Sequence, residues 1–389
     1  MKKILISYDY FFPGFKAGGP IQSLVNLASL LNEEYNISVL TSANDLNETN
    51  AYENIKINNW NLILLPGTKN SINVWYADRK GLNYNTLKTL IAGLKPEIIY
   101  INSMYSVHFT LYPIIALKNL SHPAKVIICP RGMLQKGALQ VKPLKKKVFL
   151  KGLKWSGIVN NVSWHATNEE EKKDIASQFL KFQQITIAPN VPKIPFDKAN
   201  NTNKQKGKLN LVYLSLVSEK KNLHLLLKEL LLSDNGVSLD IYGPIKDEQY
   251  WEQECKPLMN SLKERVIYKG NIEPINVQNK LIEYDTLVLL TKGENFGHAL
   301  YESLSVGRPI ITSYYTPWNN LEENKAGWNV VIEETGTIAS LFNDLLQTDN
   351  NTFQEFCVGA NTLAKEYYCL LYTSPSPRDR TRYRMPSSA

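Results

Sequence analysis

The amino-acid sequence predicts an α/β protein made of two doubly wound domains. Apolar runs of strand length alternate with helical patterns along the chain, which is typical of parallel sheets covered by helices on both faces. This alternation stops in a polar, Asn- and Lys-rich stretch at residues 196–208 and starts again at Leu209. The 389 residues are enough for two domains of ordinary size.

The first half of the chain, residues 1–195, is expected to form the first domain. Its apolar runs predict the strands Lys3–Ser7, Ile37–Thr41, Asn61–Pro66, Glu97–Asn102, Lys125–Pro130, Ser163–Thr167 and Ile185–Pro189. Helices are expected between them, for example over Pro20–Leu31 and Thr86–Leu94. Pro20 suits the first turn of a helix, where its missing amide costs no hydrogen bond.

Residues 196–208 lack apolar periodicity and are the expected linker. The second domain, residues 209–350, is predicted to contain the strands Leu209–Leu214, Leu239–Gly243, Val266–Gly270, Asp285–Thr291 and Pro309–Thr312. A helical pattern over Thr352–Tyr368 follows, within a segment that spans residues 351–368.

The last residues, Cys369–Ala389, change abruptly in composition and resemble the translation of a sequencing-library adapter. Pro, Ser and Arg dominate, so little apolar surface is available to offset the entropy of ordering. We therefore expect this segment to be disordered, without packed secondary structure, and the natural reading frame to be cut short near Tyr368. A basic arm that binds a membrane or a nucleic acid is the alternative.

The composition is that of a soluble globular protein, with 43% hydrophobic and 21% charged residues. No apolar run approaches the about 18 to 20 residues that span a bilayer. Asp9 ends the first apolar run too early for a signal peptide, so a buried strand is expected there. The four cysteines and five histidines are scattered without metal-ligand spacing, which favours a reducing cytoplasm and no metal site.

The most informative motif is Gly293-Glu294-Asn295-Phe296-Gly297-His298-Ala299-Leu300-Tyr301-Glu302. It follows a predicted buried strand and opens a helix that is expected to run to Gly307. Ligands of open α/β sheets bind at such strand–helix junctions. The amides of residues 295–297 would favour a diphosphate at the helix N-terminus. Glu302, about one turn into the helix, could accept hydrogen bonds from ribose hydroxyls.

This motif, with Gly307-Arg308-Pro309-Ile310-Ile311 and Thr316-Pro317-Trp318, resembles the glutamate-pair motif of the family 4 retaining glycosyltransferases, also called group 1 glycosyltransferases. The resemblance covers roughly residues 1–368. It implies the GT-B fold, in which two Rossmann-like domains face a cleft where donor and acceptor meet. The final helix of that fold crosses back onto the first domain, and Thr352–Tyr368 would begin this return.

The resemblance also implies the reaction. A sugar would move from a nucleotide-diphosphate donor to a glycan or lipid-linked acceptor, with retained configuration, in cell-surface polysaccharide synthesis. No metal or other cofactor is expected. The candidate catalytic residues are Glu294, Arg131 and His298, and the candidate donor-binding residues are Lys221, Asn295, Phe296, Gly297, Glu302 and Arg308. Neutral His298, at a helix N-terminus that disfavours its cation, would donate a hydrogen bond to phosphate or sugar.

Two positions depart from the family pattern. The family usually has an arginine five residues before Lys221, but Leu216 stands there and cannot make the contact of a guanidinium. Diphosphate binding would then rest on Lys221, the helix amides, and Arg308 or Lys292.

In the first domain, Arg131 follows a strand where many family members carry a histidine. It could hold phosphate or sugar hydroxyls but cannot act as a general base. His108 and His165 are the alternative histidines. Gly18 and Gly19 lie in the loop between the first strand and helix, which in the family faces the donor phosphates and the acceptor.

Other functions remain open at this stage. A nucleotide-sugar epimerase could use the same fold without a glycan acceptor, and a glycan-binding relative could lack catalysis. The basic stretch Lys142–Lys154 is either a solvated helix face or a contact with an anionic membrane surface or a lipid-diphosphate acceptor. No recognised module accompanies the charge, so nucleic acid is not expected. The expected location is the cytoplasm, with peripheral binding to the inner face of the membrane as an option.

Overall fold

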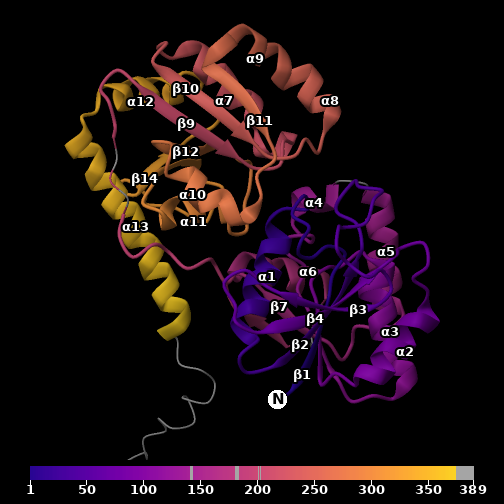
Figure 1. The fold of residues 1–389 in the computed structure, drawn as a ribbon. Helices are drawn as coiled ribbons and strands as arrows, with labels where there is room; N and C mark the ends of the chain where they lie inside the picture. Colours follow the sequence, from indigo (N-terminus) through magenta and orange to yellow (C-terminus); the bar gives the residue numbers. More distant parts are fainter. Residues whose placement is uncertain (141–142, 180–183, 200, 202, 374–389) are drawn as a thin grey trace, which may run out of the picture. The chain divides into compact units, whose positions relative to one another are not determined.

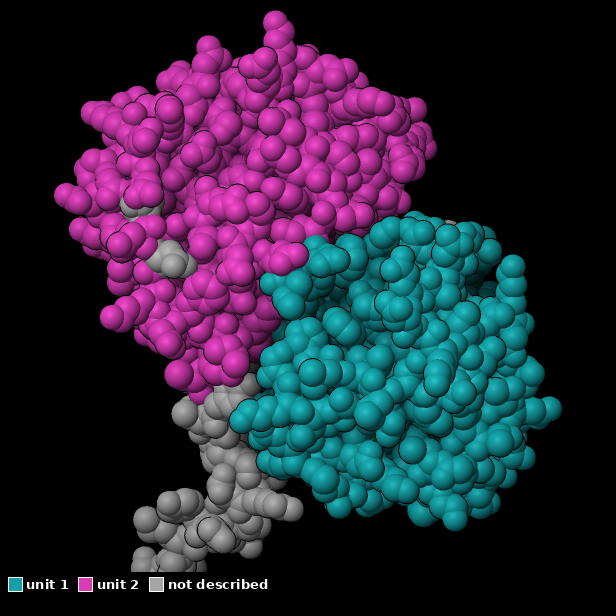
Figure 2. All heavy atoms as spheres, viewed as in Figure 1, with its two compact units in different colours: residues 1–191, 273–275 teal, residues 192–272, 276–389 magenta. Residues whose placement is uncertain are grey.

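A computed structural model describes residues 1–140, 143–179, 184–199, 201 and 203–373. The chain divides into two compact units, shown in teal and magenta in Figure 2. The first comprises Met1–Val191 with Glu273–Ile275, and the second Pro192–Ile272 with Asn276–Ala389. Each unit is built around its own, mostly parallel sheet, which confirms the predicted α/β class with two doubly wound domains.

The boundary between the units lies at Val191 and Pro192, earlier than the predicted end of the first domain at residue 195. The predicted linker, residues 196–208, belongs to the second unit. Its backbone amides find partners there: Phe196 N–H donates to Ser305 O (2.9 Å) and Gly207 N–H to Leu346 O (2.8 Å). The polar composition without periodicity therefore indicated a lack of regular secondary structure. It did not indicate a free linker, because the segment is hydrogen-bonded to the second unit.

The first unit contains an eight-stranded sheet of order β3-β4-β2-β1-β5-β6-β7-β8. Its strands are β1 (Lys3–Ser7), β2 (Asn36–Ser42), β3 (Trp60–Leu64), β4 (Ser71–Ala77), β5 (Ile98–Ile101), β6 (Lys125–Ile128), β7 (Ser163–Ala166) and β8 (Ile185–Ile187). Its helices are α1 (Gly19–Leu31), α2 (Tyr84–Leu94), α3 (Tyr112–Leu120), α4 (Lys136–Gln140), α5 (Pro143–Trp155) and α6 (Glu169–Gln178), with a π-helical turn at Val107–Leu111.

Strand β1 lies in the middle of this sheet, and its side chains enter two cores. Ile4 and Ile6 belong to one buried cluster and Leu5 to another, because successive side chains of a strand point to opposite faces. Strand β4 was not predicted. It pairs in parallel with β2 and antiparallel with β3, so a hairpin forms one edge of a sheet that otherwise follows the predicted parallel pattern.

The second unit contains a six-stranded parallel sheet of order β11-β10-β9-β12-β13-β14. Its strands are β9 (Leu209–Leu214), β10 (Val237–Tyr242), β11 (Val266–Gly270), β12 (Thr286–Leu289), β13 (Ile310–Ser313) and β14 (Gly327–Val330). Its helices are α7 (Leu223–Leu232), α8 (Glu248–Tyr250), α9 (Lys256–Leu262), α10 (Val277–Leu281), α11 (His298–Ser305), α12 (Thr337–Gln347) and α13 (Asn350–Thr373). Numbered by appearance, this strand order is 3-2-1-4-5-6, the arrangement of dinucleotide-binding sheets.

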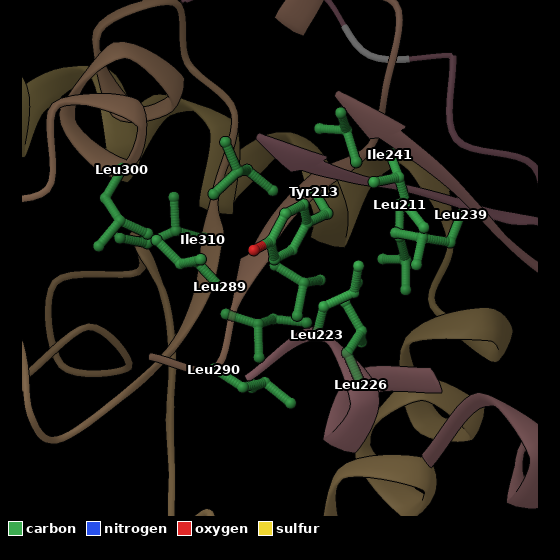
Figure 3. Packing of buried hydrophobic residues seen from close by; sticks show 14 of the residues in the cluster. Leu211, Tyr213, Leu223, Leu226, Leu239, Ile241, Leu289, Leu290, Leu300 and Ile310 are labelled. Carbon is green, nitrogen blue, oxygen red and sulfur yellow. The ribbon is translucent and has the colours of Figure 1, made fainter. Parts of the chain in front are cut away.

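The core of the second unit is apolar on both sides of the sheet. Figure 3 shows Tyr213 of β9 among leucines and isoleucines of the neighbouring strands and of α7. The Tyr213 hydroxyl donates to Leu216 O (3.2 Å), so the buried ring leaves no unpaired polar atom. Leu223 and Leu226 of α7 are buried beside it, and burial of each such side chain contributes about 1.5 to 3 kcal/mol.

The last described helix, α13, runs from Asn350 to Thr373 and packs along α11 (Figure 1). Asn361 anchors it: its Nδ2 donates to Phe196 O (3.0 Å) and to Ser305 O (3.1 Å). The expected loss of secondary structure at Cys369 is wrong for the first residues of that segment, because the helix continues to Thr373. Residues 374–389 lie outside the described residues.

None of the described helices combines the length and apolar character needed to cross a membrane.

A buried carboxylate joins α7 to α12. Glu229 of α7 is fully buried and accepts hydrogen bonds from Gly336 N–H (2.9 Å to one oxygen) and Ala339 N–H (2.9 Å). These amides belong to the start of α12, where the first N–H groups lack intrahelical partners and the helix dipole favours negative charge. Glu229, which lies on α7, therefore holds the N-terminus of α12 in place against α7.

Replacing this carboxylate should destabilise the second unit. Glu229→Gln keeps the size of the side chain but removes its charge and turns one acceptor into a donor that faces amides. We expect a loss of about 2 kcal/mol in the free energy of unfolding, measured by urea denaturation. Glu264→Gln, at an exposed glutamate of the same unit, should change it by less than about 0.5 kcal/mol. Equal stability of the two variants would contradict this role of Glu229.

Candidate active site

The candidate site lies where the strand order of the second sheet reverses, between β9 and β12. Connections leave these two neighbouring strands in opposite directions, and such switch points are the usual ligand sites of open α/β sheets. After β9 the chain forms the 3₁₀ turn Glu219–Lys221, and after β12 it continues through residues 290–297. Lys292 N–H donates to Lys220 O (2.9 Å), so a backbone hydrogen bond joins the two connections.

The central contact of the site is an ion pair between Lys221 Nζ and Glu294 Oε1. Both side chains are mostly buried, with exposed fractions of 17% and 14%. Glu294 is also held through its backbone, because its N–H donates to Tyr315 O (2.9 Å) in the connection after β13. The structure thus brings together two residues that the sequence predicted for one site.

Further lysines surround this pair. Burial lowers the pKa of the Lys220 amino group, and the charges of Lys221 and Lys246 lower it further, partly offset by Glu294. Lys220 is nevertheless exposed as a whole residue. Lys246 follows β10 and was not predicted; Lys246 N–H donates to Val217 O (3.1 Å). Such a group of cations favours an anionic ligand.

The position of the missing arginine is occupied by the half-buried Leu216, whose carbonyl accepts the Tyr213 hydroxyl. Lys292, named as a possible replacement, is paired with Glu219 (3.1 Å) in an exposed ion pair. Lys220, Lys221 and Lys246 therefore provide the positive charge at the carboxyl ends of β9 and β10.

Helix α11 begins at His298, later than the start of the motif. Gly297 caps it in the left-handed region (φ 77°), and an added Cβ would lie 2.8 Å from the Leu300 side chain. A glycine is therefore required at this position. Asn295 and Phe296 belong to the connection before the helix, whose N-terminus and dipole point toward the residues that follow β12.

Phe296 and His298 lie side by side at this helix start, with ring centroids 4.8 Å apart. The Phe296 ring is buried against Tyr301, Trp318 and Tyr367, and its carbonyl accepts the Trp318 Nε1–H (2.5 Å). The Thr316-Pro317-Trp318 sequence is thus part of the packing that supports the site, and the ring of Phe296 has a structural role.

Glu302 lies on α11 and is also mostly buried, with 6% of the residue exposed. Its Oε1 pairs with Lys193 Nζ at 2.6 Å. Lys193 was not predicted as a site residue, because it lies in an irregular segment more than a hundred positions away in the sequence. Both glutamates of the motif therefore face a lysine from another part of the second unit.

The structure does not bring Arg308 to this group. Arg308 precedes β13, at the amino ends of the parallel strands, whereas Glu294 follows β12 at their carboxyl ends. Its guanidinium is buried and donates to Ile282 O (2.8 Å) and Asn201 O (3.2 Å). The predicted donor contact of Arg308 is replaced by a structural role at the opposite edge of the sheet.

In the first unit, Arg131 fixes the carboxyl ends of several strands. Its backbone is in the left-handed region (φ 53°), which is uncommon for a residue other than glycine. Its guanidinium donates to Asn102 Oδ1 (2.6 Å), to Asn190 Oδ1, and to the Tyr100 hydroxyl (3.1 Å). Each guanidinium nitrogen thus has a partner within the unit, and a catalytic role for Arg131 stays a prediction.

A second polar group adjoins Arg131. The Tyr100 hydroxyl lies 2.8 Å from His165 Nδ1, and His165 Nε2 lies 2.7 Å from Ala188 O. Burial alone would raise the pKa of the Cys129 thiol, but Arg131 and His165 outweigh it and the pKa is lowered. Cys129 is fully buried. His108 lies in the π-helical turn, its ring against Tyr112.

The strand order of the first sheet reverses between β1 and β5, and Asp9 follows β1 there. Asp9 Oδ1 accepts from Arg79 Nη2 (3.2 Å) and from the Ser106 hydroxyl (3.1 Å). Burial raises the pKa of Asp9, and Arg79 offsets part of this effect.

The two predicted loop glycines lie at the start of α1. Gly18 caps α1 with a φ of 76°, and Gly19 is exposed at the first position of that helix.

No group of three or more His, Cys, Asp or Glu side chains within the described residues is arranged to hold a metal ion. Lysines and the N-terminus of α11 contribute positive charge at the site. Such a site suits a ligand that carries several negative charges close to hydroxyl groups.

Comparison with known proteins gives a family match for part of the chain. Residues 196–355 match the model of the family described as "Glycosyl transferases group 1". This match includes the Lys221 turn and the Glu294–Glu302 motif. The predicted resemblance to the group 1 glycosyltransferases is confirmed: residues 196–355 form a group 1 glycosyltransferase domain, and the chain is a glycosyltransferase. No curated protein matches the sequence.

Solved structures share the whole fold. HepE of Anabaena in complex with UDP-glucose is 15% identical, with a TM-score of 0.69 over 95% of this chain and 96% of that chain. Sucrose-phosphate synthase of Thermosynechococcus elongatus is 14% identical, with a TM-score of 0.69 over 95% of each chain. TarM of S. aureus is 15% identical, with a TM-score of 0.64 over 96% of this chain and 100% of that chain. These likenesses confirm the GT-B fold.

The Lys221–Glu294 pair should contribute to stability as a unit. Lys221→Met leaves Glu294 mostly buried without its cation, and we expect a loss of about 2 kcal/mol in unfolding free energy. Adding Glu294→Gln should recover more than half of that loss, because the uncompensated charge is then removed. Urea denaturation of both variants measures this, with Lys228→Met on exposed surface as the control. Additive losses in the double variant would show that the two side chains do not interact.

Proposed function

We propose that this glycosyltransferase is a retaining enzyme that moves a sugar from a nucleotide-diphosphate sugar to a glycan or lipid-linked acceptor in cell-surface polysaccharide synthesis. The observation that carries this proposal is the Lys221–Glu294 pair at the switch point of the second sheet. HepE and TarM, whose fold the chain shares, were solved with UDP-glucose and with UDP respectively, which supports a nucleotide-diphosphate donor. Uridine is therefore the first base to test.

The charges of the site suit the departure of a nucleoside diphosphate. When the bond between the sugar anomeric carbon and the phosphate oxygen breaks, negative charge develops on the diphosphate. Lys220, Lys221 and Lys246, together with the N-terminus of α11, would stabilise that charge, and such electrostatic stabilisation usually contributes more to catalysis than any other single effect. Glu294 would contact the donor sugar, and Glu302 the ribose.

Retention would follow from attack on the same face of the sugar. The acceptor hydroxyl oxygen forms the new bond to the anomeric carbon, and its proton passes to the departing phosphate oxygen, so that no protein nucleophile is required. His298, beside Phe296 at the start of α11, would donate a hydrogen bond to the phosphate or the sugar. In this proposal the lysines and amides replace a metal ion.

Two alternatives make different predictions. An epimerase would convert its nucleotide sugar without an acceptor, and a glycan-binding relative would release no nucleotide. Incubation of the purified protein with nucleotide sugars, with and without glycan or polyprenyl-diphosphate-linked acceptors, separates all three. Acceptor-dependent release of nucleoside diphosphate supports the transferase, and isomerised donor without acceptor supports the epimerase.

The two glutamates should affect different kinetic steps. Glu302→Gln should weaken nucleotide affinity, measured by calorimetry, because it loses a charged acceptor for ribose hydroxyls. Glu294→Gln should chiefly lower kcat, because it loses contacts to the reacting sugar. Each effect should be roughly ten- to a hundredfold, since hydrogen bonds to charged groups are worth about 1.5 to 3 kcal/mol. Wild-type affinity and turnover in both variants would exclude these assignments.

We also propose that α5 places the enzyme on an anionic membrane surface, at the inner face of the cytoplasmic membrane. Leu144, Val148 and Trp155 are 78%, 71% and 94% exposed. Their spacing places them on one face of the helix, while Leu150 and Leu153 face the core. Exposed apolar side chains interleaved with lysines are typical of helices that lie in a membrane interface. Lys142, at the start of the predicted segment, lies outside the described residues.

Charge removal on α5 should weaken binding to anionic vesicles. Each lysine near an anionic surface contributes about 1 kcal/mol, so combining Lys145→Gln, Lys147→Gln and Lys151→Gln should lower the partition coefficient roughly a hundredfold. Sedimentation with phosphatidylglycerol vesicles measures this, and phosphatidylcholine vesicles should bind little of either protein. Lys228→Gln in the second unit is the control for one lost charge. Unchanged sedimentation of the triple variant would contradict membrane binding through α5.

A further inference from the structure

The ion pair between Lys193 and Glu302 joins the donor helix to the first residues of the second unit. The Nζ–Oε1 distance is 2.6 Å, and the side chains are only 18% and 8% exposed. Lys193 is the second residue of that unit, which begins at Pro192. This contact is short and largely shielded from water, so it is a strong constraint on where the Glu302 carboxylate lies.

The segment that carries Lys193 is itself held in place. Gln278 Nε2 on α10 donates to Ile194 O (3.2 Å) and to the Ser305 hydroxyl (2.9 Å). Phe196 N–H donates to Ser305 O (2.9 Å), and Asn361 Nδ2 on α13 donates to both Phe196 O and Ser305 O. Ser305 ends α11, the helix that contains Glu302. The segment that carries Lys193 is thus hydrogen-bonded to the end of α11, the helix whose Glu302 is paired with Lys193.

A carboxylate as buried as Glu302 needs a compensating charge. Removing one member of a buried pair leaves the other charge uncompensated, which is unfavourable for the fold. Glu302 lies in the motif that also contains Glu294, and each of the two is paired with a lysine. Lys193 is therefore the compensating charge of Glu302 in this structure.

We propose that Lys193 is a positioning residue for the nucleotide: it orients and compensates the Glu302 carboxylate so that the carboxylate can accept hydrogen bonds from the ribose hydroxyls. This inference rests on the proposed function, which supplies a donor that contains ribose. A carboxylate offers about four acceptor sites on its two oxygens. Pairing through Oε1 therefore leaves acceptor capacity for a vicinal diol.

The ribose hydroxyls provide a readout that a purely structural lysine would not affect. If Lys193 acts through Glu302, its loss should reduce the part of nucleotide affinity that depends on the 2′- and 3′-hydroxyls. If Lys193 instead contacted the diphosphate, its loss should weaken nucleotides with and without these hydroxyls equally. UDP and 2′,3′-dideoxy-UDP are therefore the probes, with calorimetry as the measurement.

The full chain should bind UDP roughly tenfold more tightly than dideoxy-UDP, as expected for one hydrogen bond to a charged acceptor. Lys193→Met should weaken UDP binding by about tenfold and dideoxy-UDP binding by less than about twofold, so that the discrimination disappears. Lys193→Arg should restore it. Lys365→Met, at another lysine that bonds the backbone near this segment, through Asp197 O, should behave as the wild type.

Several outcomes would overturn the inference. Full discrimination between the two nucleotides in Lys193→Met would exclude a role through Glu302, and equal weakening of both would indicate a phosphate contact or a general structural loss. Thermal unfolding of each variant identifies the latter, and Lys193→Gln provides a second substitution if Lys193→Met does not fold. Absence of any nucleotide binding by the wild type would overturn the proposed function itself, and this inference with it.

Discussion

The pairing of β9 with β12 is the contact on which the candidate active site depends. Leu211 pairs with Thr286 and Val212 with Leu287, so two strands far apart in the sequence become neighbours in the sheet. Their connections leave in opposite directions, and the space at their carboxyl ends is bordered by the Lys221 turn and the Glu294 connection. Any change that separated these strands would move every charged group of the site.

Charge compensation is the second constraint on this site. Each of the two glutamates of the motif is paired with a lysine within the second unit. The absence of an arginine at position 216 does not leave the site without positive charge, because the charges of Lys221 and Lys246 both act on Lys220. Burial is the main cause of the lowered pKa of Lys220, and the charges of Lys221 and Lys246 lower it further.

The sequence was sufficient for elements defined by local pattern, and insufficient for long-range contacts. Strands β1, β9 and β11 have the predicted bounds, because continuous apolar runs identify buried strands. The short edge strand β14 was missed: it begins at Gly327, which is required by a close approach to Ile310 O. The partner of Glu302 could not be predicted either, since no spacing rule relates Lys193 to α11. Arg308 was predicted to bind the donor because it lies in a family motif. Its partners are instead the carbonyls of Ile282 and Asn201, which the motif does not reveal.

The contacts of Asn361 have a consequence for the order in which the chain folds. This side chain joins two carbonyls, at Phe196 and Ser305, and the first lies 165 positions earlier. During synthesis at about 5 to 20 residues per second, the start of the second unit must wait on the order of ten seconds before α13 emerges. The first unit, whose residues are nearly all made by then, folds while the second is still incomplete. A chaperone that shields growing chains would therefore act mainly on the second unit.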